Sequence, residues 1–384
     1  MRVFIIAGEP SGDKLGGALM AGLKTLVPDV TFDGIGGDEM QAQGLTSRFD
    51  MSELSIMGIM EVLPKYRHLK RRIAQTAQAV TDTAPDVMIT IDSPDFCLRV
   101  ARLVKASGTT RTVHYVAPTV WAWRPKRAVH MAQVIDHVLA LFPFEPPYMQ
   151  AAGMDCDFVG HPVVSEPQPT AEEVARFRVQ YGMEAADPLL LVLPGSRRGE
   201  VARLAPRLGA ALKPVLQAHP KLRVVVPAAA PVAGMVIDAV AGWPLVPKVL
   251  DPRGLDVETA ASAKRVAFAA ADAALAASGT VALELAAADT PMVSAYDMNW
   301  LSRRIVQRMM QIDTANLINI VSETRTVPEF IGANCRSDLI ARGVLDLLND
   351  LEPQRAAMQT TMDLLGRQGE DPGLRAARAV LARL

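Results

Sequence analysis

Short apolar runs alternate with longer helical patterns along most of this chain, and this alternation limits the possible folds more than any other feature. The runs are rich in Val, Ile and Leu, whereas 15–26 and 67–83 repeat apolar residues at helical spacing. Such alternation predicts an α/β fold class with parallel sheets and right-handed crossovers. The expected strands are Val3–Ala7, Val30–Ile35, Val87–Ile91, Thr112–Val116, His137–Leu141, Phe158–Val159, Leu189–Leu193, Leu222–Val226, Ala273–Leu275 and Pro291–Ala295.

A proline-rich stretch from Gly160 to Pro169 interrupts this pattern and has the composition of a linker. A chain of 384 residues that is 50% hydrophobic can bury two cores. We therefore expect two Rossmann-like doubly wound domains, over 1–165 and 170–345, facing across a cleft. Only helices are expected over 346–384. These helices could pack on the first domain or on a partner subunit, and the sequence does not choose between the two.

Charge and cysteine content argue against several classes of protein. Lys and Arg number 40 against 41 Asp and Glu, a net charge of -1 that does not suit a nucleic-acid binder. Cys97, Cys156 and Cys335 are widely spaced and form no zinc or disulfide framework, which fits a reducing, cytoplasmic compartment. No segment approaches the roughly 20 apolar residues of a membrane span, so any membrane contact is expected to be peripheral.

The stretch from Pro194 to Glu200 carries the clearest chemistry. It follows a buried-type run, breaks into Pro, Gly and Ser, adds two arginines and begins a helix at about Glu200. Free backbone N–H groups, a positive helix end and guanidinium groups at one point are suited to phosphate. We expect Ser196 and Arg197 to contact it and Arg198 to face solvent.

A second anion site is expected after the run that ends near Ala276. Ser278, Gly279 and Thr280 are small enough to let a diphosphate approach a helix N-terminus. Glu284, about one turn inside that helix, is placed to bind ribose hydroxyls. A capped helix without a ligand is the structural alternative.

Asp92 and Asp95 flank the end of one expected strand and the start of a helix. A carboxylate beyond the carboxyl end of a central strand can act as a general base on a hydroxyl. Alternatively, both carboxylates only cap the helix. Asp95 suits the cap, so Asp92 is the preferred base and Asp95 the alternative.

The loop from Gly8 to Gly17 follows the first strand but matches neither the Walker pattern nor GxGxxG. It is expected to form either a tight turn capped by Ser11 or Asp13, or the wall of an acceptor site that includes Ser11.

Trp121, Trp123, Arg124 and Lys126 follow another strand. Aromatic planes beside cations suit a phosphorylated sugar, while ordinary packing of the tryptophans is the alternative.

An apolar run from Leu54 to Pro64, which includes Met57, precedes a basic segment that ends at Arg72. This combination is typical of a surface that touches an anionic bilayer or takes in acyl chains. A buried helix with a solvated end is the alternative.

Asp155-Cys156-Asp157 has the DxD pattern of many metal-dependent sugar-nucleotide enzymes. Here it is expected to precede its strand, whereas a metal-binding pair should follow one. No metal site is therefore expected.

Several of these motifs together resemble the lipid-A-disaccharide synthase family, in the family's order over most of the chain. They are Ala7–Asp13, Met57–Leu63, Ile91–Phe96, Trp121–Arg127, Leu193–Arg197 and Ala277–Thr280. The resemblance implies a GT-B glycosyltransferase that joins UDP-2,3-diacylglucosamine to 2,3-diacylglucosamine 1-phosphate (lipid X) with inversion. The products would be UDP and a β-1,6-linked disaccharide 1-phosphate.

The resemblance also assigns roles to single residues. It places the essential aspartate at Asp92, the phosphate-binding arginine at Arg197, the sugar-nucleotide glutamate at Glu284 and a cleft asparagine at Asn316. It implies no metal or organic cofactor, a homodimer, and a peripheral enzyme at the cytoplasmic face of the inner membrane of a Gram-negative bacterium. Pro10 and Pro125 depart from the residues common in the family, alanine and glutamine, without removing a chemical group. After about Ser337 the resemblance carries nothing over residue by residue.

Overall fold

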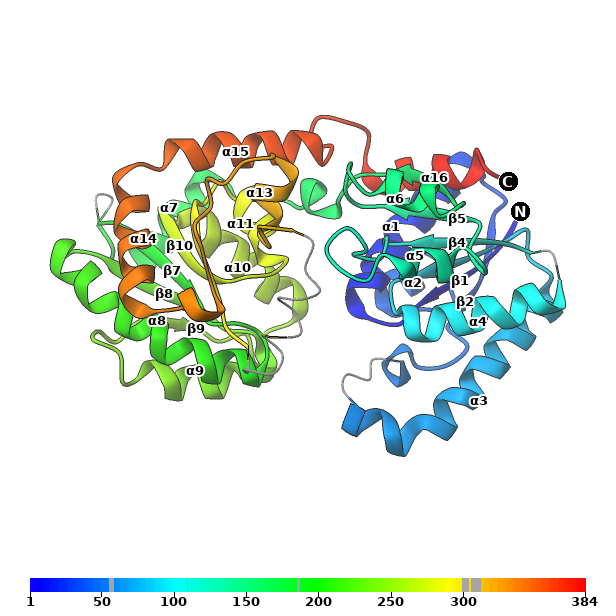
Figure 1. Cartoon of the computed structure of the whole chain (residues 1–384), viewed down its shortest axis with the longest axis horizontal. Helices are drawn as coiled ribbons and strands as arrows, with labels where there is room; N and C mark the ends of the chain where they lie inside the picture. Colours follow the sequence, from blue (N-terminus) through cyan, green and yellow to red (C-terminus); the bar gives the residue numbers. More distant parts are fainter. Residues whose placement is uncertain (55–58, 109, 185–186, 299–303, 305–311) are drawn as a thin grey trace. The chain divides into compact units, whose positions relative to one another are not determined.

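The computed structural model describes residues 1–54, 59–108, 110–184, 187–298, 304 and 312–384 (Figure 1). The chain forms two compact units. The first contains Met1–Ser165 together with Leu365–Leu384, and the second contains Glu166–Leu364. The expected end of the second domain at residue 345 differs from this division. It falls inside a helix of the second unit, Ser337–Asn349.

The first unit is built on a parallel six-stranded sheet with the order β2-β1-β3-β4-β5-β6. Alternate residues of β1 enter opposite cores: Phe4 and Ile6 lie on one side, and Ile5 on the other. The strands are β1 (Arg2–Ala7), β2 (Thr31–Ile35), β3 (Val87–Ile91), β4 (Arg111–Tyr115), β5 (His137–Ala140) and β6 (Asp155–Phe158). The helices are α1 (Pro10–Leu26), α2 (Asp38–Ala42), α3 (Ile59–Thr83), α4 (Pro94–Ser107), α5 (Lys126–Met131), α6 (Pro146–Ala151) and α16 (Pro372–Leu381).

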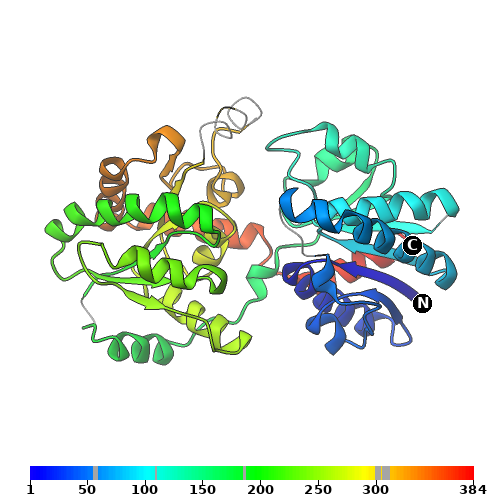
Figure 2. The ribbon, with the colours of Figure 1, turned by 90° about the horizontal axis from the view of Figure 1, so that it is seen from below.

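The second unit repeats this architecture, with the strand order β12-β11-β10-β7-β8-β9 and helices on both faces of the sheet (Figure 1 and Figure 2). Its strands are β7 (Leu189–Leu193), β8 (Arg223–Pro227), β9 (Lys248–Leu250), β10 (Ala273–Ala277), β11 (Met292–Tyr296) and β12 (Glu329–Ile331). Its helices include α7 (Ala171–Gln180), α8 (Arg198–Ala218), α9 (Ala233–Val240), α10 (Val257–Ala270), α11 (Val281–Ala287), α13 (Leu317–Val321), α14 (Ser337–Asn349) and α15 (Glu352–Leu364). The α/β fold class with two doubly wound domains is thus confirmed.

The expected strands are present, but the sequence missed two and misplaced one. The missed strands, β9 and β12, have three residues each and form the two edges of the second sheet. Edge strands are only half covered and need no long apolar run. The misplaced strand is β6, which begins at Asp155. The expectation that the DxD pattern precedes its strand is therefore wrong.

The C-terminal helix α16 returns to the first unit and packs on α1. A Cβ atom on Gly22 would lie 2.6 Å from the Gly373 carbonyl oxygen, and one on Gly373 would lie 2.6 Å from that of Ala18. The two glycines therefore allow the helix backbones to meet directly. Ser165 and Asp371 add a hydrogen bond of 3.0 Å between the ends of the two segments that form this unit.

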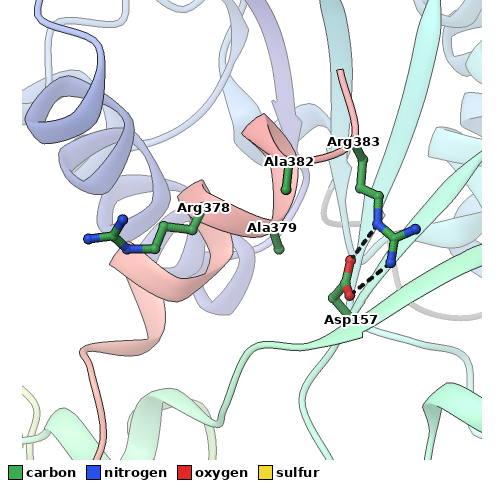
Figure 3. A pocket seen from close by; sticks show the side chains of 5 residues that line it. All are labelled: Asp157, Arg378, Ala379, Ala382 and Arg383. Carbon is green, nitrogen blue, oxygen red and sulfur yellow. Dashed lines mark hydrogen bonds and ion pairs between the residues drawn. The ribbon is translucent and has the colours of Figure 1, made fainter.

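The DxD carboxylates also hold the end of the chain. Arg383 donates to Asp155 at 3.1 Å and to Asp157 at 3.2 Å, and it lines an open pocket between α16 and β6 (Figure 3). Asp155 binds Arg111 as well, and Asp157 binds His137. Both carboxylates thus already have hydrogen-bond or ion-pair partners within the protein. No group of three or more His, Cys, Asp or Glu in the described ranges is arranged to hold a metal ion.

Candidate functional site

Most of the expected site residues lie at the carboxyl edge of one of the two sheets. In the first unit, Ser11 follows β1, Asp92 follows β3, and Trp123 follows β4. In the second unit, Arg197 follows β7 and Ser278 follows β10. In parallel sheets these strand ends form one edge, which is the usual ligand-binding edge of such folds. Each sheet thus gathers its own group of polar side chains.

Asp92 stands at the end of the central strand β3 on a strained turn. Its φ angle is 49° and that of Ser93 is 43°, both in the left-handed region that costs a non-glycine residue free energy. The backbone N–H of Asp92 donates to the Tyr115 carbonyl at 3.0 Å, which fixes the turn to β4. The Ser93 hydroxyl is enclosed with no hydrogen-bond partner among the described residues. Such strain is often kept at functional sites.

The alternative for Asp92 and Asp95 was that both carboxylates only cap the helix α4. Neither of them does so. The N-cap residue is Ser93, and no side chain makes the capping hydrogen bond. Asp95 is exposed in the first turn of the helix, where its charge suits the helix dipole. Asp92 is half-buried, and no hydrogen bond to its carboxylate occurs in the described part of the chain. The Asp92 carboxylate therefore caps no helix in the described part of the chain.

In the loop after β1, neither Ser11 nor Asp13 caps the helix that follows. The N-cap of α1 is Glu9, with no side-chain cap, and Ser11 is exposed. The buried carboxylate of Asp13 instead accepts hydrogen bonds from the N–H groups of Gly37 at 2.7 Å, Glu39 at 3.0 Å and Met40 at 3.2 Å. Asp13 of α1 thus caps the neighbouring helix α2.

Trp121 packs in the protein, as the structural alternative required, whereas Trp123 is exposed. The Trp121 ring lies edge-on to Phe144, with ring centroids 5.0 Å apart. Trp123 is 37% exposed, and the Arg124 guanidinium lies 4.5 Å from the centre of its ring. Lys126, the first residue of α5, is exposed as well. The surface available to a ligand after β4 therefore consists of Trp123, Arg124 and Lys126.

The buried residue Glu145 stabilises the loop that carries this surface, and it was not predicted from the sequence. Glu145 is 2% exposed, and its carboxylate accepts hydrogen bonds from the Trp121 indole at 3.3 Å, from the N–H of Leu141 at 3.1 Å and from that of Phe142 at 3.0 Å. Burial raises the pKa of Glu145 to about 7. No local pattern identifies this residue, because its partners come from two separate loops.

The loop after β7 is arranged around an internal carboxylate. Glu200 accepts hydrogen bonds from the N–H groups of Ser196 at 3.1 Å and Arg197 at 3.3 Å. The expectation of free backbone N–H groups is therefore wrong for these two residues. Helix α8 begins at Arg198, slightly earlier than expected. The Arg197 side chain is 69% exposed and remains accessible to a ligand.

The second small-residue loop lies on the adjacent strand, since Leu193 of β7 pairs with Ala276 of β10. Its helix, α11, has no side-chain cap, so the hydroxyls of Ser278 and Thr280 are not used for capping. Gly279 is exposed, and a Cβ atom there would meet nothing within 4 Å. Glu284 is half exposed and forms an ion pair with Lys264. This loop is open, and it lies beside the loop that carries Arg197.

Asn316 is not part of this group. It is 2% exposed, and its side-chain oxygen caps α13 by accepting from the N–H of Ile318 at 2.9 Å. Its amide group contacts the sulfur of Met292, the first residue of β11, at 3.9 Å. Asn316 therefore lies near the start of β11, whereas Ser278 lies at the carboxyl edge of the sheet.

The apolar and basic segment can be described only in part. Met57 lies outside the described residues. In the basic part, Arg67, Lys70 and Arg71 are exposed, whereas Arg72 forms an ion pair with Glu53. The Arg72 guanidinium lowers the pKa of Glu53 to about 2. None of the described helices is long and apolar enough to cross a membrane.

The fold is shared with solved structures of low sequence identity. A putative UDP-N-acetylglucosamine 2-epimerase from Listeria monocytogenes has a TM-score of 0.63 at 14% identity, covering 100% of this chain and 95% of its own. The Anabaena HepE protein in complex with UDP and glucose has a TM-score of 0.60 at 13% identity, covering 100% of both chains. These similarities support the two-domain GT-B fold.

The sequence comparisons identify the family. Residues 3–381 match the family model described as lipid-A-disaccharide synthetase. Lipid-A-disaccharide synthase from Ruegeria pomeroyi is 65% identical, over 100% of this chain and 96% of that protein. The enzyme of the same name from Rhodospirillum centenum is 45% identical, over 99% and 94%. The chain belongs to the lipid-A-disaccharide synthase family of glycosyltransferases.

Proposed function

We propose that this enzyme transfers the sugar of UDP-2,3-diacylglucosamine to the 6-hydroxyl of 2,3-diacylglucosamine 1-phosphate (lipid X). The reaction proceeds with inversion and gives UDP and the β-1,6-linked disaccharide 1-phosphate. The observation that carries this proposal is the half-buried carboxylate of Asp92 after β3, which has no hydrogen-bond partner among the described residues. The other unit supplies two anion-type loops, on its adjacent strands β7 and β10. Membership of the family supports the choice of substrates.

In the proposed mechanism Asp92 is the general base. Its carboxylate takes the proton of the acceptor 6-hydroxyl as that oxygen attacks the anomeric carbon. The bond from this carbon to the UDP oxygen breaks at the same time, and inversion follows from attack on the opposite face. The second carboxylate, Asp95, is the alternative base.

The second unit then binds the donor and stabilises the leaving group. Arg197 and Ser196 contact the diphosphate, whose developing charge is also stabilised by the N-terminal end of α11. Ser278, Gly279 and Thr280 let the phosphates approach closely, and Glu284 binds the ribose hydroxyls. These groups can stabilise the charge without a metal or organic cofactor.

The first unit binds the lipid acceptor. Trp123, Arg124 and Lys126 suit a phosphorylated sugar, and Ser11 borders the same sheet edge. Met57 and its apolar neighbours, with the exposed Arg67, Lys70 and Arg71, are proposed to receive acyl chains and to touch anionic lipid. We place the enzyme at the cytoplasmic face of the inner membrane, as a peripheral homodimer.

Two other functions remain as alternatives. One is a transferase or epimerase that uses a different UDP-sugar, which would act on a substrate without acyl chains. The other is a membrane-associated protein that binds a sugar nucleotide without catalysis, for which Asp92 would be dispensable.

The proposal is tested by incubating the purified protein with both acylated glucosamine substrates and EDTA, and by detecting products with mass spectrometry. We expect the disaccharide 1-phosphate and UDP. Absence of product with and without added Mg²⁺ would exclude this activity, and product only with Mg²⁺ would exclude the metal-free mechanism. Turnover of a non-acylated acceptor at the same rate would favour the first alternative.

A further inference from the structure

The Arg197 loop is folded around the carboxylate of Glu200. One oxygen of Glu200 accepts the N–H groups of Ser196 and Arg197, and the other lies 3.2 Å from Nη1 of Arg197. Glu200 is only 8% exposed, so these contacts are made inside the loop. A single side chain thus binds both the backbone of the loop and the guanidinium that it carries.

Gly195 makes this close arrangement possible. Its φ angle is 112°, a conformation that favours glycine. A Cβ atom at this position would lie 2.6 Å from Cβ of Glu200 and 2.7 Å from one carboxylate oxygen. The glycine is therefore required both by the backbone angle and by the space that Glu200 fills.

These contacts change how the loop can bind an anion. Because the N–H groups of Ser196 and Arg197 already have an acceptor, these two groups are not available to a phosphate, and Arg197 must contribute through its side chain. Arg197 uses one of its five N–H donors on Glu200 and keeps the others on a largely exposed side chain. A guanidinium that is already held by one hydrogen bond loses less conformational entropy on binding a ligand than a freely moving guanidinium does.

We infer that Glu200 is a positioning residue for substrate binding, which shapes the Ser196-Arg197 loop and orients the Arg197 guanidinium toward the donor diphosphate. The inference rests on the proposed function, because Arg197 is there the phosphate-binding residue. Glu200 itself does not touch the substrate.

The test measures UDP binding by isothermal titration calorimetry to the full-length native protein and to Arg197→Ala, Glu200→Gln and the double variant. Glu200→Gln is expected to raise the Kd for UDP about tenfold. The loss of affinity in the double variant should be smaller than the sum of the two single losses, since Glu200 acts largely through Arg197. Additive losses, or unchanged or tighter binding by Glu200→Gln, would overturn the inference.

Glu173 provides a matched control. Like Glu200 it is the third residue of a helix and accepts a hydrogen bond from the backbone N–H at the helix start, from Thr170 at 2.7 Å. Glu173→Gln should leave the Kd for UDP unchanged. If Glu200→Gln does not fold, Glu200→Asp keeps the charge with a shorter reach and should weaken UDP binding as well; native affinity in that variant would contradict the inference.

Failure of the inference is distinguishable from failure of the proposed function. If the native protein does not bind UDP, the proposed function is wrong. If UDP binds and Arg197→Ala weakens it while Glu200→Gln does not, only the role of Glu200 is wrong.

Discussion

The Trp121 indole donates a hydrogen bond of 3.3 Å to the buried carboxylate of Glu145. This bond joins the loop after β4, which carries Trp123 and Arg124, to the loop after β5. Because the carboxylate also accepts two backbone N–H groups, one side chain holds both loops together.

Glu145 should make the stability of the fold depend on pH. Burial raises its pKa from 4.5 to about 7, so the folded state binds this proton more tightly than the unfolded state does. The resulting stabilisation is complete below about pH 4.5 and is lost as the pH rises to about 7, by an amount on the order of 3 kcal/mol. Urea unfolding of native protein and Glu145→Gln at pH 5 and pH 8 checks this. The native protein should lose more free energy of unfolding between these two pH values than the variant, and equal losses would contradict the prediction.

Asp92→Asn should lower turnover by about 100-fold to 10,000-fold while UDP binding is kept, because it removes the proposed base. Asparagine tolerates the left-handed backbone of this turn, so the fold should survive. Asp95→Asn is the matched control, because this exposed carboxylate lies only three residues along the chain, and this variant should retain most activity. The reverse result, with Asp95→Asn inactive, would assign the base to Asp95.

Gly22→Ala should destabilise the protein by about 1–3 kcal/mol, because the added methyl group would meet the Gly373 carbonyl oxygen at 2.6 Å. The comparison is Gly242→Ala, where a Cβ atom meets nothing within 4 Å. Chemical denaturation of both variants gives the difference. Equal stability would show that α16 can move away from α1 at no cost.

Asn316→Ala should lower the free energy of unfolding by about 1–2 kcal/mol, because it removes the cap of α13 and leaves the N–H of Ile318 unpaired. Asp256→Ala removes an exposed cap, that of α10, where water can replace the lost acceptor, and should cost less. The Kd of Asn316→Ala for UDP should stay near the native value. A large rise of this Kd at native stability would show instead that Asn316 binds the substrate.

Much of the fold could be predicted from the sequence because its strands are buried on both faces. β3 and β7 are fully buried runs that are apolar except for Thr90, and a helix pattern follows each. By contrast, β6 alternates Asp155, Cys156 and Asp157, and the polar residues conceal a strand at the edge of its sheet. The two short edge strands β9 and β12 have too few residues to produce a pattern.

The candidate site also has a part that could be predicted from the sequence and a part that could not. The positions of Asp92, Arg197 and Ser278 were predictable, because each lies in the loop after an apolar run whose carboxyl end must lie at the ligand edge. Their roles in binding and catalysis stay predictions. The supporting residues were not predictable. Asp13 caps a helix other than its own, and Glu145 accepts hydrogen bonds from two loops.

The sequence by itself determined the α/β class, the two doubly wound sheets and the strand ends at which the chemistry is expected, because apolar periodicity and turn residues act locally along the chain. Only the tertiary structure decided which polar groups are already paired. Glu200 occupies two N–H groups of the Arg197 loop, and Arg383 occupies the DxD carboxylates. The physical reason is that a hydrogen-bond donor or acceptor is satisfied by whatever lies within about 3 Å of it, and residues far apart in sequence, such as Asp157 and Arg383, reach that distance only after the chain has folded.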